Sequence, residues 1–196
     1  MSASPSKNWI FVRHGQTDWN AENRIQGQTD IPLNAHGRAQ AKINGESLAR
    51  LGLAQDIPFF VSPMHRAQET ARIVRETMGL PPTDFTTVPN LRELTFGEWE
   101  GRTLVEVWTA DPDPVEDRKR DKWNYVPPGG ESYAQLALRV APVLDALPDE
   151  AVIVSHGGVM RTIIQRYANV PEDEAAVLEM DQDKAWRWNG EAGSWA

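Results

Sequence analysis

The sequence predicts an α/β protein: a three-layer α/β/α sandwich around a mostly parallel central sheet. Three short apolar runs, residues 9–12, 59–61 and 151–154, lack polar alternation, which is typical of strands buried on both faces. Stretches with helical periodicity separate these runs, and strands that alternate with helices favour helical layers on both sides of a sheet. Each run leads into histidine, arginine or serine, at the sheet edge where open α/β folds bind ligands.

The first part of the chain is expected to hold one strand, a long loop and one helix. Residues 1–8 contain no run of apolar residues, and we expect them to form a disordered tail. Residues 16–33 are rich in polar and turn-forming residues and predict a loop. Asn34 is a suitable N-cap for a helix over about 35–51. The spacing predicts that its inner face consists of Ala39, Ile43, Ser47 and Leu51.

The second strand is expected to lead directly into a helix. Ser62 is a good N-cap and Pro63 suits the first helical position. Gly79 is expected to end this helix. Its predicted apolar face is Ala67, Ala71, Val74 and Met78. Arg66 then falls in the first turn, beside the sheet edge, where an arginine facing phosphate should lie.

The second half of the chain completes the alternation. A weak strand is predicted near 85–88 and a short helix over 103–110, followed by residues 111–130, which have four prolines and no clear period. We interpret about 102–130 as a lid or insert over the sheet. A helix with a Pro142 kink or stop, a strand at 151–154 and a helix over 158–167 follow. The helix containing Pro142 has an apolar face of Tyr133, Leu136, Val140, Val143, Leu144 and Leu147. Residues 185–188 predict an edge strand.

The bulk composition narrows the functional classes. At 196 residues the chain is long enough for one domain with a substantial core, and its formal net charge of −8 argues against nucleic acid as a partner. The absence of cysteine excludes disulfides, thiolate zinc sites and cysteine-nucleophile phosphatases, and it fits a reducing compartment. No signal peptide or membrane-spanning stretch is recognisable, so we expect a cytoplasmic protein without a membrane partner. The tryptophan-rich tail is a candidate homodimer interface.

Several segments, in order along the chain, resemble one protein family. The run from Arg13 to Asn20 reads RHGQTDWN, and it is followed by GQTDIPL at 27–33, SPMHRAQETA at 62–71, and LRE at 91–93. The last matching segments are GEWEG at 97–101, PGGES at 128–132, and SHGG at 155–158. This ordered set resembles the histidine phosphatase superfamily, in the branch that contains cofactor-dependent phosphoglycerate mutase. The resemblance implies a phosphoglycerate mutase-like fold with a single domain over 9–196. Gln16 and Asn34 depart from the commoner residues, and neither is expected to be a phosphate ligand.

The resemblance also implies roles that suit the side chains. His14 would be the nucleophile that forms a phosphohistidine, and Glu93 the general acid and then base. The planar guanidinium groups of Arg13 and Arg66 suit the non-bridging oxygens of a phosphate. A cationic His156 would add a third positive group. Asn20 and the backbone N–H of Gly157 would donate further hydrogen bonds to the phosphate.

Other charged residues receive plainer interpretations. Glu98 and Glu100 lie close to Glu93 in sequence and compete with it as the acid. His36 and His65 are expected to face solvent or to support the site indirectly. The run Arg118-Lys119-Arg120 lies in the expected lid, where it is either a solvated face or a contact for an acidic substrate group.

Rival chemistries remain open at this level. Two histidines and a carboxylate can form a metal site, but the adjacent arginines would repel a cation, so we expect no metal or other cofactor. Residues 111–115, DPDPV, resemble an aspartate-nucleophile phosphatase motif but follow a poor strand. A third alternative is a non-catalytic protein that binds phosphorylated ligands.

The favoured hypothesis is a phosphatase that hydrolyses a small-molecule phosphomonoester. The alternative enzyme is a cofactor-dependent phosphoglycerate mutase. Mutases of the family carry a longer and more basic insert before the last helix–strand–histidine segment, whereas the insert here is short and interrupted by proline. The sequence does not identify the substrate.

Overall fold

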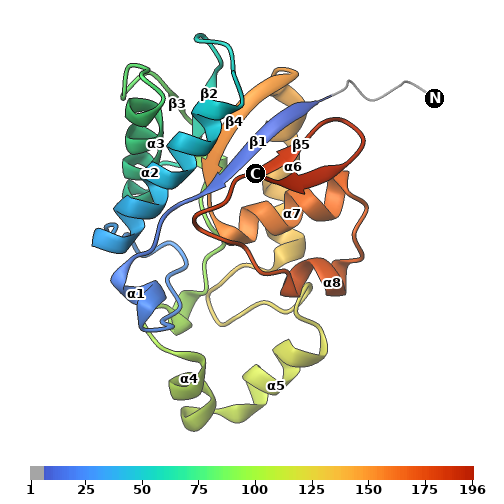
Figure 1. Ribbon diagram of the computed structural model, residues 1–196. Helices are drawn as coiled ribbons and strands as arrows, with labels where there is room; N and C mark the ends of the chain where they lie inside the picture. Colours follow the sequence, from blue (N-terminus) through green and yellow to red (C-terminus); the bar gives the residue numbers. More distant parts are fainter. Residues whose placement is uncertain (1–6) are drawn as a thin grey trace, which may run out of the picture.

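A computed structural model describes residues 7–196 and places them around one six-stranded sheet with the strand order β3-β2-β4-β1-β5-β6 (Figure 1). The strands comprise β1 (Asn8–Arg13), β2 (Phe59–Val61), β3 (Thr86–Thr87), β4 (Glu150–Ser155), β5 (Trp186–Trp188) and β6 (Gly193–Trp195). The first four are mutually parallel, whereas β5 and β6 are antiparallel to their neighbours. The prediction of a mostly parallel α/β sheet is confirmed.

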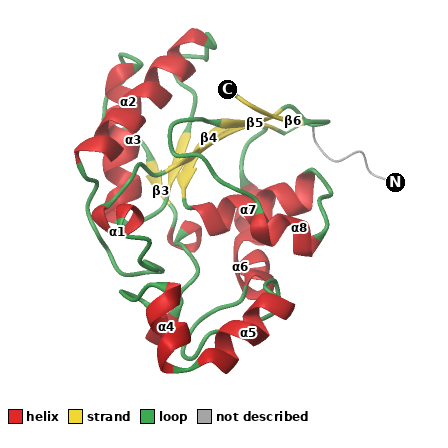
Figure 2. Ribbon diagram, turned by 60° about the horizontal axis from the view of Figure 1, so that its bottom comes forward, coloured by secondary structure: helices red, strands yellow, loops and turns green. Residues whose placement is uncertain are grey.

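Helices cover both faces of this sheet (Figure 2). One layer consists of α2 (Ala35–Arg50) and α3 (His65–Thr77), and the other of α6 (Tyr133–Ala146), α7 (Gly157–Tyr167) and α8 (Glu172–Val177). Pro142 lies inside α6 without ending it. No helix among residues 7–196 has the length and apolar character needed to cross a membrane.

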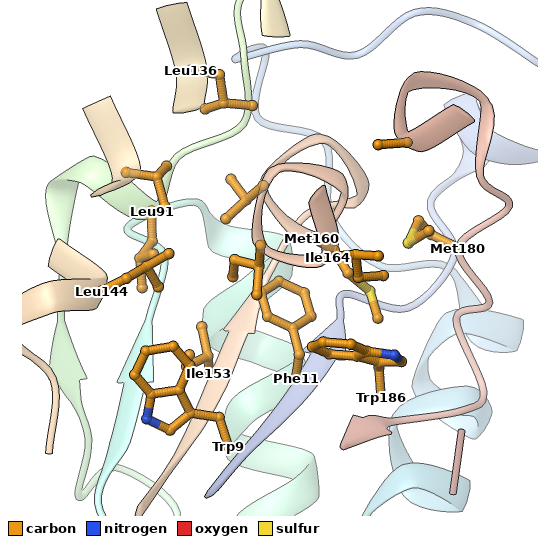
Figure 3. Packing of buried hydrophobic residues seen from close by; sticks show 14 of the residues in the cluster. Trp9, Phe11, Leu91, Leu136, Leu144, Ile153, Met160, Ile164, Met180 and Trp186 are labelled. Carbon is orange, nitrogen blue, oxygen red and sulfur yellow. The ribbon is translucent and has the colours of Figure 1, made fainter. Parts of the chain in front are cut away.

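Strand β1 divides the core between the two layers. Trp9 and Phe11 belong to the large cluster under α6 and α7, which is shown in Figure 3, whereas Ile10 and Val12 belong to the cluster under α2 and α3. Successive side chains of a strand point to opposite faces, so an unbroken apolar run is what a strand with two covered faces requires. This burial fixes β1 and its neighbour β4 in register, and therefore fixes the residues that follow them.

The inner face of α2 differs from the prediction. Asn34 caps the helix by accepting a hydrogen bond from the backbone N–H of Gly37 at 2.9 Å, as expected. However, Ile43 is 46% exposed, whereas Leu48 is buried. The buried positions are Gly37, Gln40, Ala41, Asn44, Gly45 and Leu48. Small and amide side chains face inward because α2 packs closely on α3 and on the loop after β1, so the apolar spacing indicated the wrong face.

Two boundaries and the tail also need correction. Helix α3 begins at His65 with Met64 as its N-cap, so Ser62 does not cap it. Strand β1 begins at Asn8, and Lys7 is buried, whereas the remaining positions of the expected tail, 1–6, lie outside the described residues. Strand β5 is internal because β6 pairs outside it. Trp186 and Trp188 are buried within the chain and stack on each other, so these two rings pack in the core, and the expected homodimer stays a prediction.

The insert forms a small helical layer beyond the carboxyl ends of the parallel strands (Figure 1). It contains α4 (Leu104–Ala110) and α5 (Pro112–Arg120), the second of which the sequence did not predict. A cluster of Trp99, Val107 and Val115 holds it together. Two single-turn helices, η1 (Pro89–Leu91) and η2 (Gly97–Trp99), lead into it, and α1 (Asp18–Ala21) lies in the first loop.

The loop after β1 depends on a close approach of two glycines. A Cβ atom on Gly37 would lie 2.1 Å from the carbonyl oxygen of Gln16, and one on Gly15 would lie 2.2 Å from the carbonyl oxygen of Gly37. These contacts are between backbones, so side-chain rotation cannot relieve them. The segment after β1 is therefore fixed against the first turn of α2.

Gly37→Ala tests this contact. Alanine favours a helix interior by about 1 kcal/mol over glycine, but a clash with backbone should cost the upper part of the ~1–3 kcal/mol range for overpacking. We expect a net loss in the free energy of unfolding, measured by urea denaturation. The exposed Lys42→Ala on the same helix should change it by less than about 0.5 kcal/mol. Equal or higher stability of Gly37→Ala would show that the loop can move away.

Candidate active site

The ends of two adjacent parallel strands bring two histidines together. Arg13 of β1 pairs with Ser155 of β4, so His14 and His156, the next residues, leave the sheet side by side. Their ring centroids are 5.1 Å apart with the planes at 60°. Both rings are almost fully buried. Strand register alone therefore places the two imidazoles at one point of the sheet edge.

The hydrogen bond of His14 determines which of its nitrogens is free. Nδ1 lies 2.8 Å from the carbonyl oxygen of Gly15. A carbonyl oxygen only accepts, so Nδ1 carries the proton and donates, and Nε2 keeps its lone pair. Burial lowers the pKa of His14 well below its ordinary value, and the positive charges of Arg66 and Arg13 lower it further. The ring is neutral near pH 7, with an unprotonated Nε2.

Arg13 and Arg66 are held by backbone carbonyl groups and have no carboxylate within hydrogen-bond distance. Arg66 donates from Nη1 to the oxygen of Thr29 and from Nη2 to that of Gly27, both at 2.8 Å. Arg13 donates from Nη1 to the oxygen of Met180 at 2.6 Å. The Nε atoms of both arginines are buried without a partner among the described residues. Asp30 is the nearest acid to Arg66, at 3.9 Å.

These two guanidinium groups create a buried positive field. Burial, followed by the charge of Arg161, lowers the pKa of Arg13 to about 10. Burial also lowers the pKa of Arg66, while the negative charge of Glu93 partly opposes this. Buried charge that is compensated only by carbonyl dipoles and by carboxylates beyond hydrogen-bond distance is costly. An anion at this point would supply the missing charge, and the forked geometry of a guanidinium suits phosphate oxygens.

His156 is held by Ser62 at the end of β2. Its Nε2 lies 2.7 Å from Ser62 Oγ, which also accepts the N–H of Met64 at 3.3 Å. The Ser62 hydroxyl proton then has Nε2 as its acceptor, so His156 carries its own proton on Nδ1. This Nδ1 is buried and has no partner among residues 7–196.

The expectation that His156 is cationic is not met in the ligand-free protein. Burial lowers the pKa of His156 well below its ordinary value, and the charges of Arg66, His14 and Arg13 act in the same direction. His156 is thus a neutral donor through Nδ1–H. A dianion bound nearby would raise its pKa by offsetting the arginines.

Glu93 lies at the same edge and is held from several sides. Its carboxylate accepts the N–H of Leu94 and of Gly158, each at 3.0 Å. Its own carbonyl oxygen accepts from Gln28 Nε2 at 3.0 Å and from Arg139 Nη2 at 3.2 Å. A Cβ atom on Gly158 would lie 2.2 Å from Glu93 Oε1. The carboxylate therefore approaches the first turn of α7 in a way that only glycine permits.

Glu98 and Glu100, the competing carboxylates, lie elsewhere. Glu98 is exposed. Glu100 accepts five hydrogen bonds, from the backbone and hydroxyl of Thr29, the backbone of Gln28 and Phe96, and the hydroxyl of Thr95. Burial alone would raise the pKa of Glu100, but these hydrogen bonds lower it on balance. Glu100 thus fixes the loop whose carbonyl groups hold Arg66.

The remaining phosphate-binding candidates present donors at the site. Asn20 accepts through Oδ1 from Thr17 and from Gln182 Nε2, and its Nδ2 has no acceptor among residues 7–196. Gly157 occupies the first position of α7, where the N–H has no partner within the helix. A Cβ on Gly157 would lie 3.5 Å from Arg13 Nε. His36 and His65 are exposed and take no part in this arrangement.

Three residues with a part in the arrangement were not found from the sequence. Gln182 donates through Nε2 to the carbonyl oxygen of His14 at 3.0 Å and to Asn20, but it lies in a stretch without periodicity or motif. Ser62 was interpreted only as a helix cap. Arg161, on α7, donates to the carbonyl oxygen of Leu178 from Nε and Nη2 and contacts the hydroxyl of Tyr133. Arg161 lies four residues after Gly157, on the same face of the predicted helix, and this spacing was the available signal for Arg161.

Comparison with known proteins identifies the family of this chain. A sequence model of the histidine phosphatase superfamily, branch 1, matches residues 9–195. Glucosyl-3-phosphoglycerate phosphatase of Mycolicibacterium vanbaalenii is 32% identical over 206 aligned positions, which cover 95% of this chain and 88% of that protein. 2,3-bisphosphoglycerate-dependent phosphoglycerate mutase 2 of Gloeobacter violaceus is 31% identical over 183 positions, which cover 88% of this chain and 80% of that protein.

A solved structure gives the same result for the fold. The crystal structure of a putative alpha-ribazole-5'-P phosphatase from Escherichia coli superposes with a TM-score of 0.80 at 27% identity, over 97% of this chain and 95% of that chain. The expected resemblance is confirmed. Because the family match extends over nearly all of the sequence, the chain belongs to branch 1 of the histidine phosphatase superfamily.

Proposed function

We propose that this protein is a phosphatase that hydrolyses a small-molecule phosphomonoester through a phosphohistidine on His14. The observation that carries the proposal is the hydrogen bond from His14 Nδ1 to Gly15, which leaves a neutral Nε2 beside the guanidinium groups of Arg13 and Arg66. A lone pair on nitrogen next to an anion-binding pocket is what attack on phosphorus requires.

The reaction has two steps. Nε2 of His14 forms a bond to phosphorus as the P–O bond to the leaving group breaks, and Glu93 acts as the general acid that gives a proton to that oxygen. Water then attacks phosphorus, Glu93 takes a proton from the water, and the N–P bond breaks to release phosphate and restore His14. General acid–base assistance of this kind contributes typically about 10²- to 10⁴-fold.

The other residues stabilise the transferred group. Negative charge spreads over three equatorial oxygens in the transition state, and preorganised donors aimed at it supply most of the catalysis. Arg13 and Arg66 provide the charge, and the Nδ1–H of His156, Nδ2 of Asn20 and the N–H of Gly157 provide neutral donors. Two fixed guanidinium groups supply the positive charge that a metal ion supplies in other phosphatases, so we propose that the reaction needs no metal.

Two features favour a phosphatase over a mutase. A mutase must keep water from its phosphoenzyme until the product is phosphorylated again, and here the cover consists of two helices of 7 and 9 residues. Among the similar proteins, glucosyl-3-phosphoglycerate phosphatase and the putative alpha-ribazole-5'-P phosphatase are named as phosphatases. A phosphoglycerate mutase is equally similar, so the two reactions need a direct experiment.

Incubation with 3-phosphoglycerate and a trace of 2,3-bisphosphoglycerate separates them. We expect release of inorganic phosphate and little 2-phosphoglycerate, as followed by ³¹P NMR, with p-nitrophenyl phosphate as a second, generic ester. His14→Ala should lower phosphate release at least about 10³-fold because the nucleophile is absent. EDTA should leave the rate unchanged.

The outcomes are distinct. Rapid isomerisation primed by 2,3-bisphosphoglycerate would replace the phosphatase with the mutase. Phosphate release that persists in His14→Ala would remove the covalent mechanism. Tight binding of esters without turnover would indicate a protein that only binds phosphorylated ligands.

Ser62→Ala tests how the proton of His156 is placed. Without the hydroxyl donor nothing fixes the tautomer of His156, so part of the population should carry the proton on Nε2 and lose the Nδ1–H donor. We expect kcat/KM to fall about tenfold, the usual effect of one hydrogen bond, and the ¹⁵N shifts of His156 to report the new tautomer. Ser62→Thr, which keeps a hydroxyl, should restore both.

Ser155→Ala is the matched control for this change. Ser155 is equally buried, but its hydroxyl donates to the carbonyl oxygen of Leu91 at 2.6 Å rather than to a histidine. Truncation there should cost stability without altering the tautomer of His156. If both alanine variants gave the same ¹⁵N spectrum as the wild type, Ser62 would have only a structural role.

The two buried histidines predict how stability depends on pH. Their pKa values are lower in the folded state than the ordinary 6.5, so the unfolded chain binds more protons below about pH 6.5 and the free energy of unfolding falls as the pH falls. Each histidine contributes a slope of up to about 1.4 kcal/mol per pH unit until its folded-state pKa is reached. Urea denaturation from pH 7.5 to 4.5 measures this slope.

Substitutions test whether His14 and His156 cause the dependence of the free energy of unfolding on pH. His14→Gln and His156→Gln should each flatten it, whereas His36→Gln, at an exposed position, should not. Identical slopes in all three variants would mean that folding does not lower the pKa of either ring.

A further inference from the structure

Arg139, on α6, holds the short segment of backbone that carries Glu93. Its Nη1 donates to the carbonyl oxygen of Asn90 at 2.8 Å and to that of Arg92 at 3.1 Å. Its Nη2 donates to the carbonyl oxygen of Glu93 itself at 3.2 Å. The backbone between η1 and η2 has no regular secondary structure, so hydrogen bonds from a side chain fix it in place of a helix or a strand.

Glu131 fixes the orientation of Arg139. Its carboxylate accepts from Arg139 Nε at 2.9 Å and from Nη2 at 2.7 Å, which is the forked pairing of a guanidinium with a carboxylate. Together with the three carbonyl groups, these bonds use all five N–H groups of the guanidinium. Glu131 is itself anchored, because its N–H donates to the carbonyl oxygen of Thr95 at 2.8 Å and the next residue, Ser132, caps α6. Only arginine offers this number of donors in one plane.

The pair holds Glu93 without adding net charge beside it. The carboxylate of Glu131 lies 2.7 Å from the guanidinium of Arg139 and neutralises it. An unpaired arginine at this place would favour the ionised form of a nearby carboxyl, and that would oppose the proposed role of Glu93 as an acid. Arg13 and Arg66 differ, because neither has a carboxylate within hydrogen-bond distance. The site thus uses a paired arginine for position and unpaired arginines for charge.

The position of this backbone decides where the carboxylate of Glu93 lies. The carboxylate accepts the N–H of Gly158 at 3.0 Å, and a Cβ atom on Gly158 would lie 2.2 Å from Oε1. In so narrow a place the side chain cannot compensate for a displaced backbone by changing its rotamer. Misplacing a reacting group by about 1 Å can lower a rate about 10²-fold, so the hold on the backbone bears directly on proton transfer.

We propose that Arg139, oriented by Glu131, is a positioning residue for proton transfer: it holds the backbone so that the carboxyl of Glu93 reaches the oxygen of the leaving group. This rests on the proposed phosphatase function and deepens its mechanism. It also gives a role to the segment PGGES at 128–132, which ends in Glu131 and the helix cap and contributes no group to the phosphate pocket as proposed.

Two esters that differ in their need for an acid test the proposal. An alkyl phosphate such as glycerol 3-phosphate expels an alkoxide, which needs a proton, whereas p-nitrophenyl phosphate expels a phenolate that is stable without one. We expect Arg139→Met to lower kcat/KM about 10²-fold for the alkyl ester and less than about threefold for the aryl ester. If Arg139 only stabilised the fold, kcat/KM would fall by the same factor for both esters.

Arg75→Met is the matched control. Arg75 is also a buried arginine that donates to a loop carbonyl, that of Pro81 at 2.7 Å, and pairs with an acid, Asp84, at 3.2 Å, but it lies at the opposite end of α3 from Arg66. This variant should lose stability and change both kcat/KM values by the same factor. Arg139→Lys serves if Arg139→Met does not fold, because it keeps the charge without the planar fork and should show the same selective loss to a smaller extent.

A double-mutant cycle separates this route from the charge of Arg139. Burial chiefly lowers the pKa of His156, and the charge of Arg139 makes a smaller contribution in the same direction. An effect through His156 would persist when Glu93 is replaced, whereas an effect through Glu93 would vanish. In the Glu93→Gln background, we therefore expect Arg139→Met to change kcat/KM for the alkyl ester less than about twofold. Additive losses would overturn the proposal.

The amide of Gly158 gives a readout that needs no turnover. Its N–H donates to Glu93 Oε2, so its ¹H shift in ¹H–¹⁵N spectra reports where the carboxylate lies. We expect this shift to move in Arg139→Met toward its value in Glu93→Gln, and to stay at the wild-type value in Arg75→Met. If the wild type hydrolyses no ester, the proposed function fails, and the Gly158 shift still decides whether Arg139 positions Glu93. An unchanged shift in Arg139→Met, or equal losses for both esters, would overturn the positioning role.

Discussion

The fold provides a buried positive charge at the carboxyl edge of a parallel sheet and does not neutralise it. Arg13 and Arg66 are desolvated, and backbone carbonyl oxygens rather than carboxylates fix their orientation. Carbonyl dipoles hold a guanidinium in place without cancelling its charge, so the pocket remains attractive to an anion. Burial, reinforced by this field, keeps the two imidazoles neutral, which is the state that the proposed nucleophile and neutral donor require.

Several residues around the pocket serve to hold its charged groups in position. Glu100 has no role at the reacting centre, yet its five hydrogen bonds fix the loop that presents the carbonyl groups of Gly27 and Thr29 to Arg66. The glycine contact between Gly15 and Gly37 fixes the segment after His14. Gly158 lets the carboxylate of Glu93 reach the start of α7. Each of these residues acts through position rather than through contact with a ligand.

The insert has a different relation to the pocket. It is held by its own small apolar cluster, beyond the strands, and it adds cations without altering the sheet. This separation suits a family whose members share one phosphate chemistry and differ in the rest of the substrate. In the proposed reaction the chemistry depends on strand ends that the core fixes, whereas the insert is a separate element whose exposed faces tolerate change.

The sequence by itself determined the fold class, the order of the strands and helices along the chain, and the phosphate-handling candidates, because buried parallel strands are continuous apolar runs and the ordered motifs lie at their ends. It did not determine the inner face of α2, where close packing selects glycine and amide side chains over Ile43. It also missed Gln182 and the role of Ser62, whose partners lie 168 and 94 positions away. Periodicity reports burial along one element, whereas the tautomer of His156 and the neutrality of both rings depend on contacts between distant segments. Only the tertiary structure decides those contacts.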